Sequence, residues 1–142
     1  MQSSDIGAAE FPYAIAVRVY WEDTDAGGVV FYANYLKFFE RARTEWLRIH
    51  GIEQQALRDE TGAMFVVAEV QMKYFASARL DDLLSVTVQV VSRRGASMEF
   101  AQQAWRGSQL LTEGRIRVGC INDQTMKPCR LPPEVVHALK PS

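Results

Sequence analysis

From Val17 to Arg48 the chain reads VRVYWEDTDAGGVVFYANYLKFFERARTEWLR, and a loop of carboxylates and glycines separates a strand pattern from a helix pattern. In the strand pattern, apolar residues alternate with smaller or more polar ones, which is the period of a half-buried strand. The apolar positions are Ile15, Val17, Val19 and Trp21. The sequence therefore predicts a strand that ends near Trp21.

The second half of this stretch predicts one long helix. Its apolar residues recur at helical spacing and many of them are aromatic. Asn34 is a candidate cap at the start of the helix, and Gly51 is placed to end it. We expect one face to carry Tyr35, Phe38, Phe39, Ala42, Trp46 and Ile49.

Further along the chain, a short helical segment is expected at about residues 52–60, and period-two alternation then predicts four more strands. The fourth, from about Ala96 to Arg106, is less regular because Gln102 and Gln103 interrupt it. The expected apolar faces are Val66, Ala68, Val70, Met72 and Tyr74 in the second strand, Leu84, Val86, Val88 and Val90 in the third, and Ile116, Val118 and Cys120 in the fifth.

The breaks between these strands are short. Residues 92–95 and 106–108 suit hairpins, and Pro132 and Pro133 open a last helical turn that ends near Leu139. One long helix followed by strands on short turns predicts an α+β fold, with an antiparallel sheet whose apolar face the helix covers. Such a sheet leaves edges and apolar surface that pairing with a second copy hides, so we expect a homo-oligomer.

With 142 residues the chain is expected to form a single domain, residues 12–142, preceded by a flexible tail, residues 1–11. The net charge of -1 provides no general attraction for nucleic acid. Two cysteines, Cys120 and Cys129, form no CxxC pair, which favours a reduced setting and structural thiols. No signal-peptide pattern or membrane-spanning apolar run is found, so we expect a cytoplasmic protein.

The chemistry of the stretch lies in its three carboxylates, Glu22, Asp23 and Asp25, followed by Gly27 and Gly28. One interpretation is that they only form a turn and cap a helix, since Asp and Gly are common in such places. The other is that a helix N-terminus presents free backbone amides, here around residues 31–33, that polarise a carbonyl and hold an oxyanion. An ionised aspartate beside them serves as nucleophile or as general base on water. An activated acyl group such as a thioester fits this arrangement.

Other hydrolytic motifs are missing from the sequence. It contains no GxSxG, HExxH, P-loop or GxGxxG pattern, and so gives no local support for a serine hydrolase, a zinc protease or a nucleotide-dependent enzyme. The two histidines, His50 and His137, lie near the expected ends of helices and are interpreted as capping or surface residues. The carboxylates therefore remain the candidates for chemistry.

The segment DTDAGGVVFYANY, followed by FERARTE at residues 39–45, resembles the hot-dog-fold acyl-CoA thioesterases of the 4-hydroxybenzoyl-CoA thioesterase class. Within that class it is most similar to the Tol-Pal-associated enzymes of Gram-negative bacteria. The resemblance covers nearly all of the chain after the first dozen residues and includes ARLDDL at 78–83 and MKP at 126–128. It implies the hot-dog fold, an antiparallel sheet of about five strands wrapped around one long central helix, and acyl-CoA hydrolysis without a cofactor or metal.

The resemblance assigns the catalytic role to Asp25 and the carbonyl-polarising role to the backbone amide of Tyr32. Many Tol-Pal-associated members have histidine at the position of Tyr32, so a role of that imidazole cannot apply here. The 4-hydroxybenzoyl-CoA enzymes have tyrosine there, and a backbone donor survives the change. Gly28 and Val29 are expected to border the substrate.

The family also implies a homodimer, often paired into a homotetramer, with the acyl site between subunits. Acyl-CoA is the expected substrate, and acyl carrier protein is a further candidate partner. Glu40 is interpreted first as a structural residue, because Lys37 and Arg43 are three residues away on the helix. Candidates to hold the coenzyme A phosphates are Arg93, Arg94, Lys127 and Arg130, each of which is alternatively a solvated surface charge.

Two alternatives stay open at the level of sequence. One is a hot-dog dehydratase or hydratase, although such chemistry usually relies on a histidine in the site. The other is a non-catalytic module that binds acyl-CoA or acyl carrier protein in the same pocket. The acyl chain length depends on the depth of the pocket, for which Phe38, Phe39, Met64 and Met72 are candidate determinants.

Overall fold

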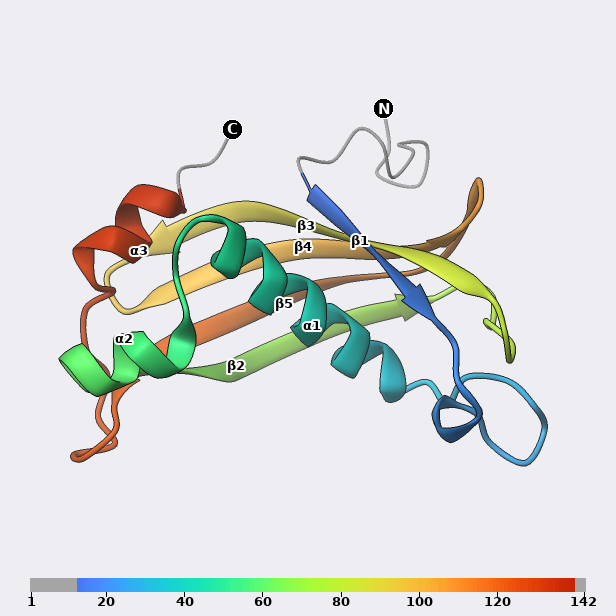
Figure 1. Ribbon diagram of the computed structural model, residues 1–142, viewed down its shortest axis with the longest axis horizontal. Helices are drawn as coiled ribbons and strands as arrows, with labels where there is room; N and C mark the ends of the chain where they lie inside the picture. Colours follow the sequence, from blue (N-terminus) through green and yellow to red (C-terminus); the bar gives the residue numbers. More distant parts are fainter. Residues whose placement is uncertain (1–12, 140–142) are drawn as a thin grey trace.

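The computed structural model describes residues 13–139 and shows one curved sheet with a long helix lying across it (Figure 1). The tail expected at residues 1–11 lies outside the described residues. All strand pairings are antiparallel. In spatial order the strands are β1 (Tyr13–Arg18), β3 (Leu83–Arg94), β4 (Ser97–Arg106), β5 (Gln109–Asn122) and β2 (Ala63–Tyr74). The expected α+β fold is confirmed.

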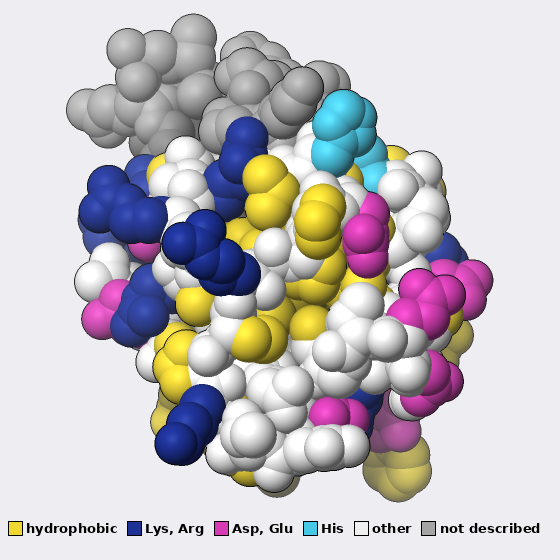
Figure 2. Space-filling model, turned by 90° about the vertical axis from the view of Figure 1, so that its left-hand side faces the viewer, with side chains coloured by type: hydrophobic (Ala, Val, Ile, Leu, Met, Phe, Trp, Pro, Cys, Tyr) yellow, Lys and Arg dark blue, Asp and Glu magenta, His cyan; other side chains and the backbone are white. Residues whose placement is uncertain are grey.

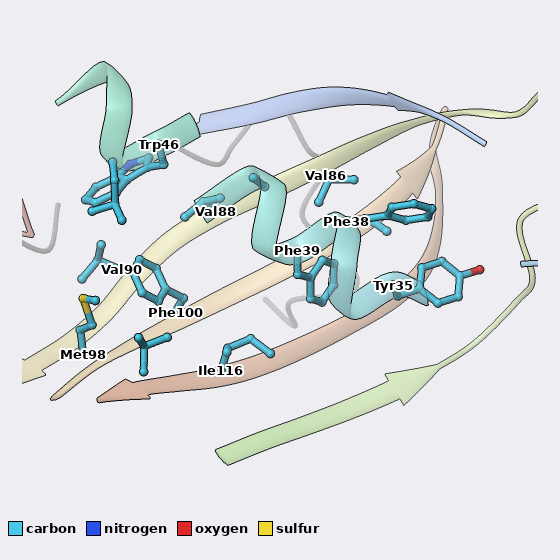
Figure 3. Packing of buried hydrophobic residues seen from close by; sticks show 14 of the residues in the cluster. Tyr35, Phe38, Phe39, Trp46, Val86, Val88, Val90, Met98, Phe100 and Ile116 are labelled. Carbon is cyan, nitrogen blue, oxygen red and sulfur yellow. The ribbon is translucent and has the colours of Figure 1, made fainter. Parts of the chain in front are cut away.

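The helices are α1 (Asn34–Ile49), α2 (Gln54–Thr61) and α3 (Pro133–Ala138), with a 3₁₀ turn η3 (Trp21–Asp23) after β1. The aromatic face of α1 packs onto the concave face of the sheet, where Phe38 and Phe39 are fully buried (Figure 3). Side chains of β3, β4 and β5 meet them, among them Val86, Phe100 and Ile116. Burial of these large apolar side chains supplies the main stabilisation of the fold, at about 1.5–3 kcal/mol for each.

The predicted faces were correct for β3 and β5 but wrong for the first half of β2. The register of β2 against β5 shifts between Val67 and Glu69, so that Ala68 is an extra residue in the strand. Before the shift, Phe65 and Val67 lie opposite the buried residues Cys120 and Val118 of β5. After it, Val70 lies opposite Ile116 and is on the same face of the sheet. An alternating pattern read straight through the strand misses this change, because a bulge exchanges the two faces.

Three further expectations near the ends of elements were wrong. Trp21 is 82% exposed, because β1 ends at Arg18 and the chain turns away into η3. Ile49 is 62% exposed at the last residue of α1. Asn34 is the first residue of that helix rather than its cap, and its side-chain amide donates a hydrogen bond to the carbonyl of Asp23 at 2.7 Å.

Gln102 and Gln103 do not interrupt β4, which runs unbroken through both. Gln102 is buried beneath α1, where its amide donates to the carbonyls of Phe39 and Thr87 and its oxygen accepts from Arg43. A buried amide is tolerated where its donors and acceptor are satisfied. Its polarity therefore marks a hydrogen-bonded core position rather than a break in the strand.

Cys120 and Cys129 are free thiols whose Sγ atoms lie 3.3 Å apart, at the end of β5 and in the following segment. Burial, together with the neighbouring thiol, raises the pKa of Cys120 to about 12. A thiol that stays protonated near neutral pH is a poor nucleophile.

None of the helices within residues 13–139 has the length and hydropathy of a membrane-spanning segment.

Candidate active site

The loop between β1 and α1 is held in shape by Asp23, which is buried. Its carboxylate accepts a hydrogen bond from the backbone N–H of Tyr20 at 2.8 Å, and its carbonyl accepts from the N–H of Phe31 and the side chain of Asn34. These bonds join the start of the loop to the start of α1. Asp23 is therefore a structural residue of the loop, as the turn-and-cap interpretation predicts.

Asp25 is exposed at the tip of the same loop. One carboxylate oxygen accepts from the N–H of Gly27 at 2.9 Å, and within residues 13–139 the other oxygen has no hydrogen-bond partner. The backbone N–H of Asp25 donates to the carbonyl of Val29 at 2.9 Å. The carboxylate is thus held at one oxygen and available at the other.

The two glycines serve different needs in this turn. A Cβ at Gly27 would come within 3.3 Å of the Asp25 carboxylate oxygen, so a side chain there would crowd the carboxylate. Gly28 has a φ of +79°, in the left-handed region where residues with a side chain are strained. The absence of a side chain at both positions lets the Asp25 carboxylate and the backbone of the turn lie close together.

The start of α1 offers free backbone donors beside this loop. Within the described chain, the N–H groups of Tyr32 and Ala33 make no hydrogen bond, as is usual in the first turn of a helix. Both residues directly precede Asn34, and the loop that carries Asp25 lies at this end of α1 (Figure 1). The helix dipole adds a partial positive charge at this point, which favours an oxyanion.

Tyr35 ties this helix end to a second loop and was not among the site residues expected from sequence. Its buried hydroxyl accepts a hydrogen bond from the N–H of Ala78 at 2.9 Å, and the carbonyl of Ala78 accepts from the N–H of Val30. Burial raises the pKa of Tyr35, although the bond from Ala78 opposes this. Sequence spacing placed Tyr35 in the core, but only the contact with Ala78 shows that its hydroxyl positions the loop.

Aromatic rings line the surface next to the Tyr32 amide. The Tyr32 ring is exposed and meets Phe31 at 4.8 Å and Tyr74, at the end of β2, at 5.8 Å between centroids. Tyr74 also meets Tyr35 at 5.9 Å. Burial, followed by the neighbouring Tyr32 and Tyr35, raises the pKa of Tyr74. These rings give an apolar border to the free amides, which suits an acyl or aryl group.

The loop that carries Ala78 is itself held by an ion pair. Arg106 on β4 donates to the Asp82 carboxylate at 2.7 Å, and the N–H of Arg79 donates to the same oxygen at 2.8 Å. Arg79 also pairs with Val29 in an isolated β-bridge. Through these contacts the position of the Asp25 turn depends on a loop some fifty residues further along the chain.

The four basic residues expected to hold coenzyme A lie at the opposite end of the sheet within one chain. Arg93 and Arg94 end β3, whose first residue Leu83 pairs with Arg18 near the Asp25 loop. A strand of this length spans about 40 Å. Lys127 and Arg130 follow β5 on the same far side, where the N–H of Leu131 donates to the carbonyl of Gly95. Figure 2 looks onto this end and shows Lys and Arg side chains gathered on one side of it. The structure does not bring these residues to Asp25 within one chain.

Two polar groups on α1 depart from the sequence interpretation. Glu40 accepts from the hydroxyl of Thr44 at 2.6 Å and forms no ion pair with Lys37 or Arg43 in the described chain. Arg43 is buried and donates to Gln102 at 2.9 Å. Arg43 shares a helical face with Phe39 and Leu47, and this spacing indicates burial. Its charge favours an exposed position, because charged side chains are seldom buried.

No group of three or more His, Cys, Asp or Glu side chains in the described part of the chain is arranged to hold a metal ion. His50 lies at the far end of α1, where its Nδ1 is 2.7 Å from the carbonyl oxygen of Trp46, and His137 lies in α3. Neither histidine is near the Asp25 loop. Among the described groups at the start of α1, those best suited to acyl transfer are the Asp25 carboxylate and the free backbone amides of Tyr32 and Ala33.

Comparison with known proteins gives a family match over residues 19–139, to the thioesterase-like superfamily. Acyl-CoA thioester hydrolase YbgC of Escherichia coli O157:H7 is 48% identical over 125 residues, covering 87% of this chain and 92% of that protein. Acyl-CoA thioesterase YbgC of Haemophilus influenzae is 46% identical over 123 residues, covering 87% and 90%. Among solved structures, a probable thioesterase from Bartonella henselae superposes with a TM-score of 0.79 at 34% identity, covering 84% of this chain and 98% of that one.

Proposed function

The chain belongs to the thioesterase-like superfamily, and we propose that it is an acyl-CoA thioesterase that hydrolyses acyl-CoA to the free acid and coenzyme A. Relatives that carry the names acyl-CoA thioester hydrolase and acyl-CoA thioesterase match most of the chain at 46–48% identity. The single observation that carries the mechanism is the exposed Asp25 carboxylate in the loop that leads into the free backbone amides at the start of α1.

In the proposed reaction the thioester carbonyl oxygen accepts a hydrogen bond from the Tyr32 N–H. The partial positive charge of the helix N-terminus stabilises the oxyanion that forms on attack. A preorganised donor of this kind contributes about 3–4 kcal/mol to other acyl-transfer reactions. The buried hydrogen bonds of Asp23 and Tyr35 support this role, because they hold the loop and the helix start in one arrangement.

Asp25 acts on the carbonyl carbon in one of two ways. As general base it removes a proton from a water molecule that attacks the carbon, and the proton then passes to the coenzyme A thiolate as the C–S bond breaks. As nucleophile it forms a mixed anhydride with release of the thiolate, and water then hydrolyses the anhydride. Label found in Asp25 after a single turnover in ¹⁸O-labelled water would show the anhydride route, because water that attacks the Asp25 carbonyl of the anhydride leaves its oxygen there.

We further propose that the working unit is at least a homodimer. The edge strand β2 exposes Val67 and Val70, and its free edge can pair antiparallel with the β2 of a second copy. In antiparallel pairing, the end of one sheet that carries the four basic residues lies beside the Asp25 loop of the other chain. Arg93, Arg94, Lys127 and Arg130 of a second copy would then reach the phosphates of a coenzyme A bound at this Asp25.

The test is thiol release from a panel of acyl-CoA and aryl-CoA substrates by the wild type and Asp25→Asn. Asparagine keeps the oxygen that accepts from Gly27, so we expect a folded protein with turnover reduced by about 10²–10⁴-fold. Glu22→Gln, an exposed neighbour in the same loop, is the matched control and is expected to keep its activity.

Turnover by Asp25→Asn equal to the wild type would contradict the role of Asp25. Tight binding of acyl-CoA or acyl carrier protein by the wild type without thiol release would show a binding module instead. Addition of water to an enoyl-CoA would show a hydratase.

A further inference from the structure

An apolar strip on β2 faces α1 and leads inward from the start of that helix. Val70, Val67 and Phe65 pair with the buried residues Ile116, Val118 and Cys120 of β5, and the strip begins at Tyr74, beside Tyr32. Val67 and Val70 in the strip are 52% and 37% exposed, although they face α1 and not the convex side of the sheet. In order from the start of α1, the strip comprises Tyr74, Met72, Val70, Val67 and Phe65.

The inner end of this strip opens on a cavity of about 120 Å³ between α1, α2 and the sheet. Four water molecules occupy about this volume in the liquid, so the cavity admits the end of a chain but not a whole acyl group. Its lining is mainly apolar and includes Leu47, Phe65, Val67, Met98 and Phe100. The charged side chains that face it are Glu40 and Arg43, and Thr44 and Gln54 add neutral polar groups.

Arg43 is the unusual member of this lining, because it is charged and only 8% exposed. In the described chain its guanidinium makes one hydrogen bond, to Gln102 at 2.9 Å, and it forms no ion pair. Burial lowers the pKa of Arg43 to about 10, against the opposing effect of Glu40, so the group is still charged at neutral pH. The Glu40 carboxylate accepts instead from the Thr44 hydroxyl.

A guanidinium has five N–H donors, and a buried charge is normally paired with a carboxylate or with several acceptors. Arg43 has one protein acceptor, and its other guanidinium nitrogens are not sealed in the core but open onto the mainly apolar cavity. Its remaining donors are suited to an oxygen atom at the end of an otherwise apolar group. This combination matches an acyl chain that carries an oxygen at its far end.

We propose that the space between α1 and β2 receives the acyl group and that Arg43 binds an acceptor oxygen, a carboxylate or hydroxyl, at the end distant from the thioester. The inference rests on the proposed function. Arg43 follows Tyr32 by eleven positions, or about 16 Å of helix, and its side chain leans back by up to one turn. Because its carbon–carbon bonds of about 1.5 Å zigzag, an extended chain advances about 1.25 Å per carbon atom, so about nine to thirteen carbon atoms cover this distance.

The experiment compares kcat/KM for three acyl-CoA substrates of about ten carbon atoms, the span set by helix rise and bond length. They end in a methyl group, a hydroxyl group and a carboxylate. We expect the wild type to prefer at least one oxygen-ended substrate over the methyl-ended one by about 10-fold to 100-fold, the usual effect of a hydrogen bond to a charged group. Substrates of about four carbon atoms should show no such preference, since they end short of Arg43.

Arg43→Met keeps the length of the side chain without its charge and should abolish the preference while methyl-ended substrates are still hydrolysed. Arg43→Lys keeps the charge without the planar fork and should retain part of the preference. Arg41→Met on the exposed side of α1 is the matched control and should keep it in full. A thermal melt of each variant checks folding.

The inference would be overturned if the wild type hydrolysed the methyl-ended, hydroxyl-ended and carboxylate-ended substrates with equal kcat/KM at both chain lengths. This result would stand whether or not the Arg43 variants fold. A preference that survives in folded Arg43→Met would also overturn it. In both cases, hydrolysis of methyl-ended substrates would leave the thioesterase function intact. If no acyl-CoA is hydrolysed, the proposed function fails, and this inference fails with it.

Discussion

Asp23 and Asp25 stand two positions apart and have opposite surroundings. Asp23 is buried and its carboxylate accepts from the backbone of Tyr20, whereas Asp25 is exposed with one oxygen available. Both carboxylates accept from backbone amides, of Tyr20 and Gly27, so both take part in forming the turn. The turn-forming interpretation of the acidic cluster therefore holds for Asp23, while the catalytic interpretation remains our proposal for Asp25.

At Tyr32 the proposed mechanism uses the backbone amide and not the phenol. Tyr32→Phe and Tyr32→Ala keep that amide, and the exposed ring is not needed to bury the core. We therefore expect both variants to retain kcat within about 10-fold, with the larger effect of Ala on KM because it removes the ring next to Tyr74. Thiol-release kinetics at saturating acyl-CoA measures this.

A loss of kcat in Tyr32→Phe as large as that expected for Asp25→Asn would assign the role to the phenol hydroxyl instead. Thermal melting of the two Tyr32 variants controls for a change in folding.

At the scale of elements, the loop from Phe75 to Asp82 holds the Asp25 turn through Ala78 and Arg79. Burial by itself would raise the pKa of Asp82, but the hydrogen bonds from Arg106 and from the Arg79 N–H outweigh it and lower the pKa below 3.8. A carboxyl whose pKa is lowered on folding stabilises the protein above its unfolded pKa. That stabilisation is lost as the pH falls through the folded pKa.

Asp82→Asn is therefore expected to lower the free energy of unfolding at pH 7 by no more than about 1 kcal/mol, since the pair with Arg106 is partly exposed. The difference from the wild type should shrink as the pH falls below about 4, where the wild-type carboxyl also becomes neutral. Urea unfolding at a series of pH values measures it.

Asp81→Asn is the matched control for this series. Its carboxylate makes no hydrogen bond or ion pair in the described chain, and asparagine tolerates the positive φ of 74° at this position. A stability difference for Asp82→Asn that stays constant from neutral to acid pH would contradict the ion-pair explanation.

For the whole molecule, the separation of Asp25 from Arg93 and Arg94 makes the dimer testable by complementation. Asp25→Asn and an Arg93→Glu/Arg94→Glu double variant should each have low activity alone. Random exchange of subunits makes half of the dimers mixed, and one of the two sites in each mixed dimer is intact. We therefore expect the 1:1 mixture to recover about a quarter of the wild-type activity.

Mixing without recovery, after mass measurement has shown that subunits exchange, would contradict a site shared between chains. Full activity of the arginine double variant alone would remove these residues from coenzyme A binding. Val70→Lys, which places a charge on β2, is expected to reduce the dimer fraction in sedimentation experiments.

Much of the fold follows from the sequence because its signals are local. Phe38, Phe39 and Ala42 recur at helical spacing, and this spacing predicts both the helix and its buried face. Val86 and Val88 recur at every second position, which predicts a strand and its buried face in the same way. The acidic and glycine-rich loop before the helix is recognisable for the same reason, whereas the choice of Asp25 within it came from the resemblance to the thioesterases. The pattern failed where β2 contains a bulge at Ala68, since the residues around it look like any other strand.

The sequence by itself determined the elements, most of their apolar faces and a carboxylate placed before a helix start. Only the tertiary structure decided that Asp23 is buried, that Tyr35 binds Ala78, that Arg43 faces a cavity and that the basic residues lie far from Asp25. Periodicity depends on neighbours a few residues apart along the chain. Burial of a charge and the meeting of two loops depend on strand register and on contacts between distant residues, which no local pattern specifies.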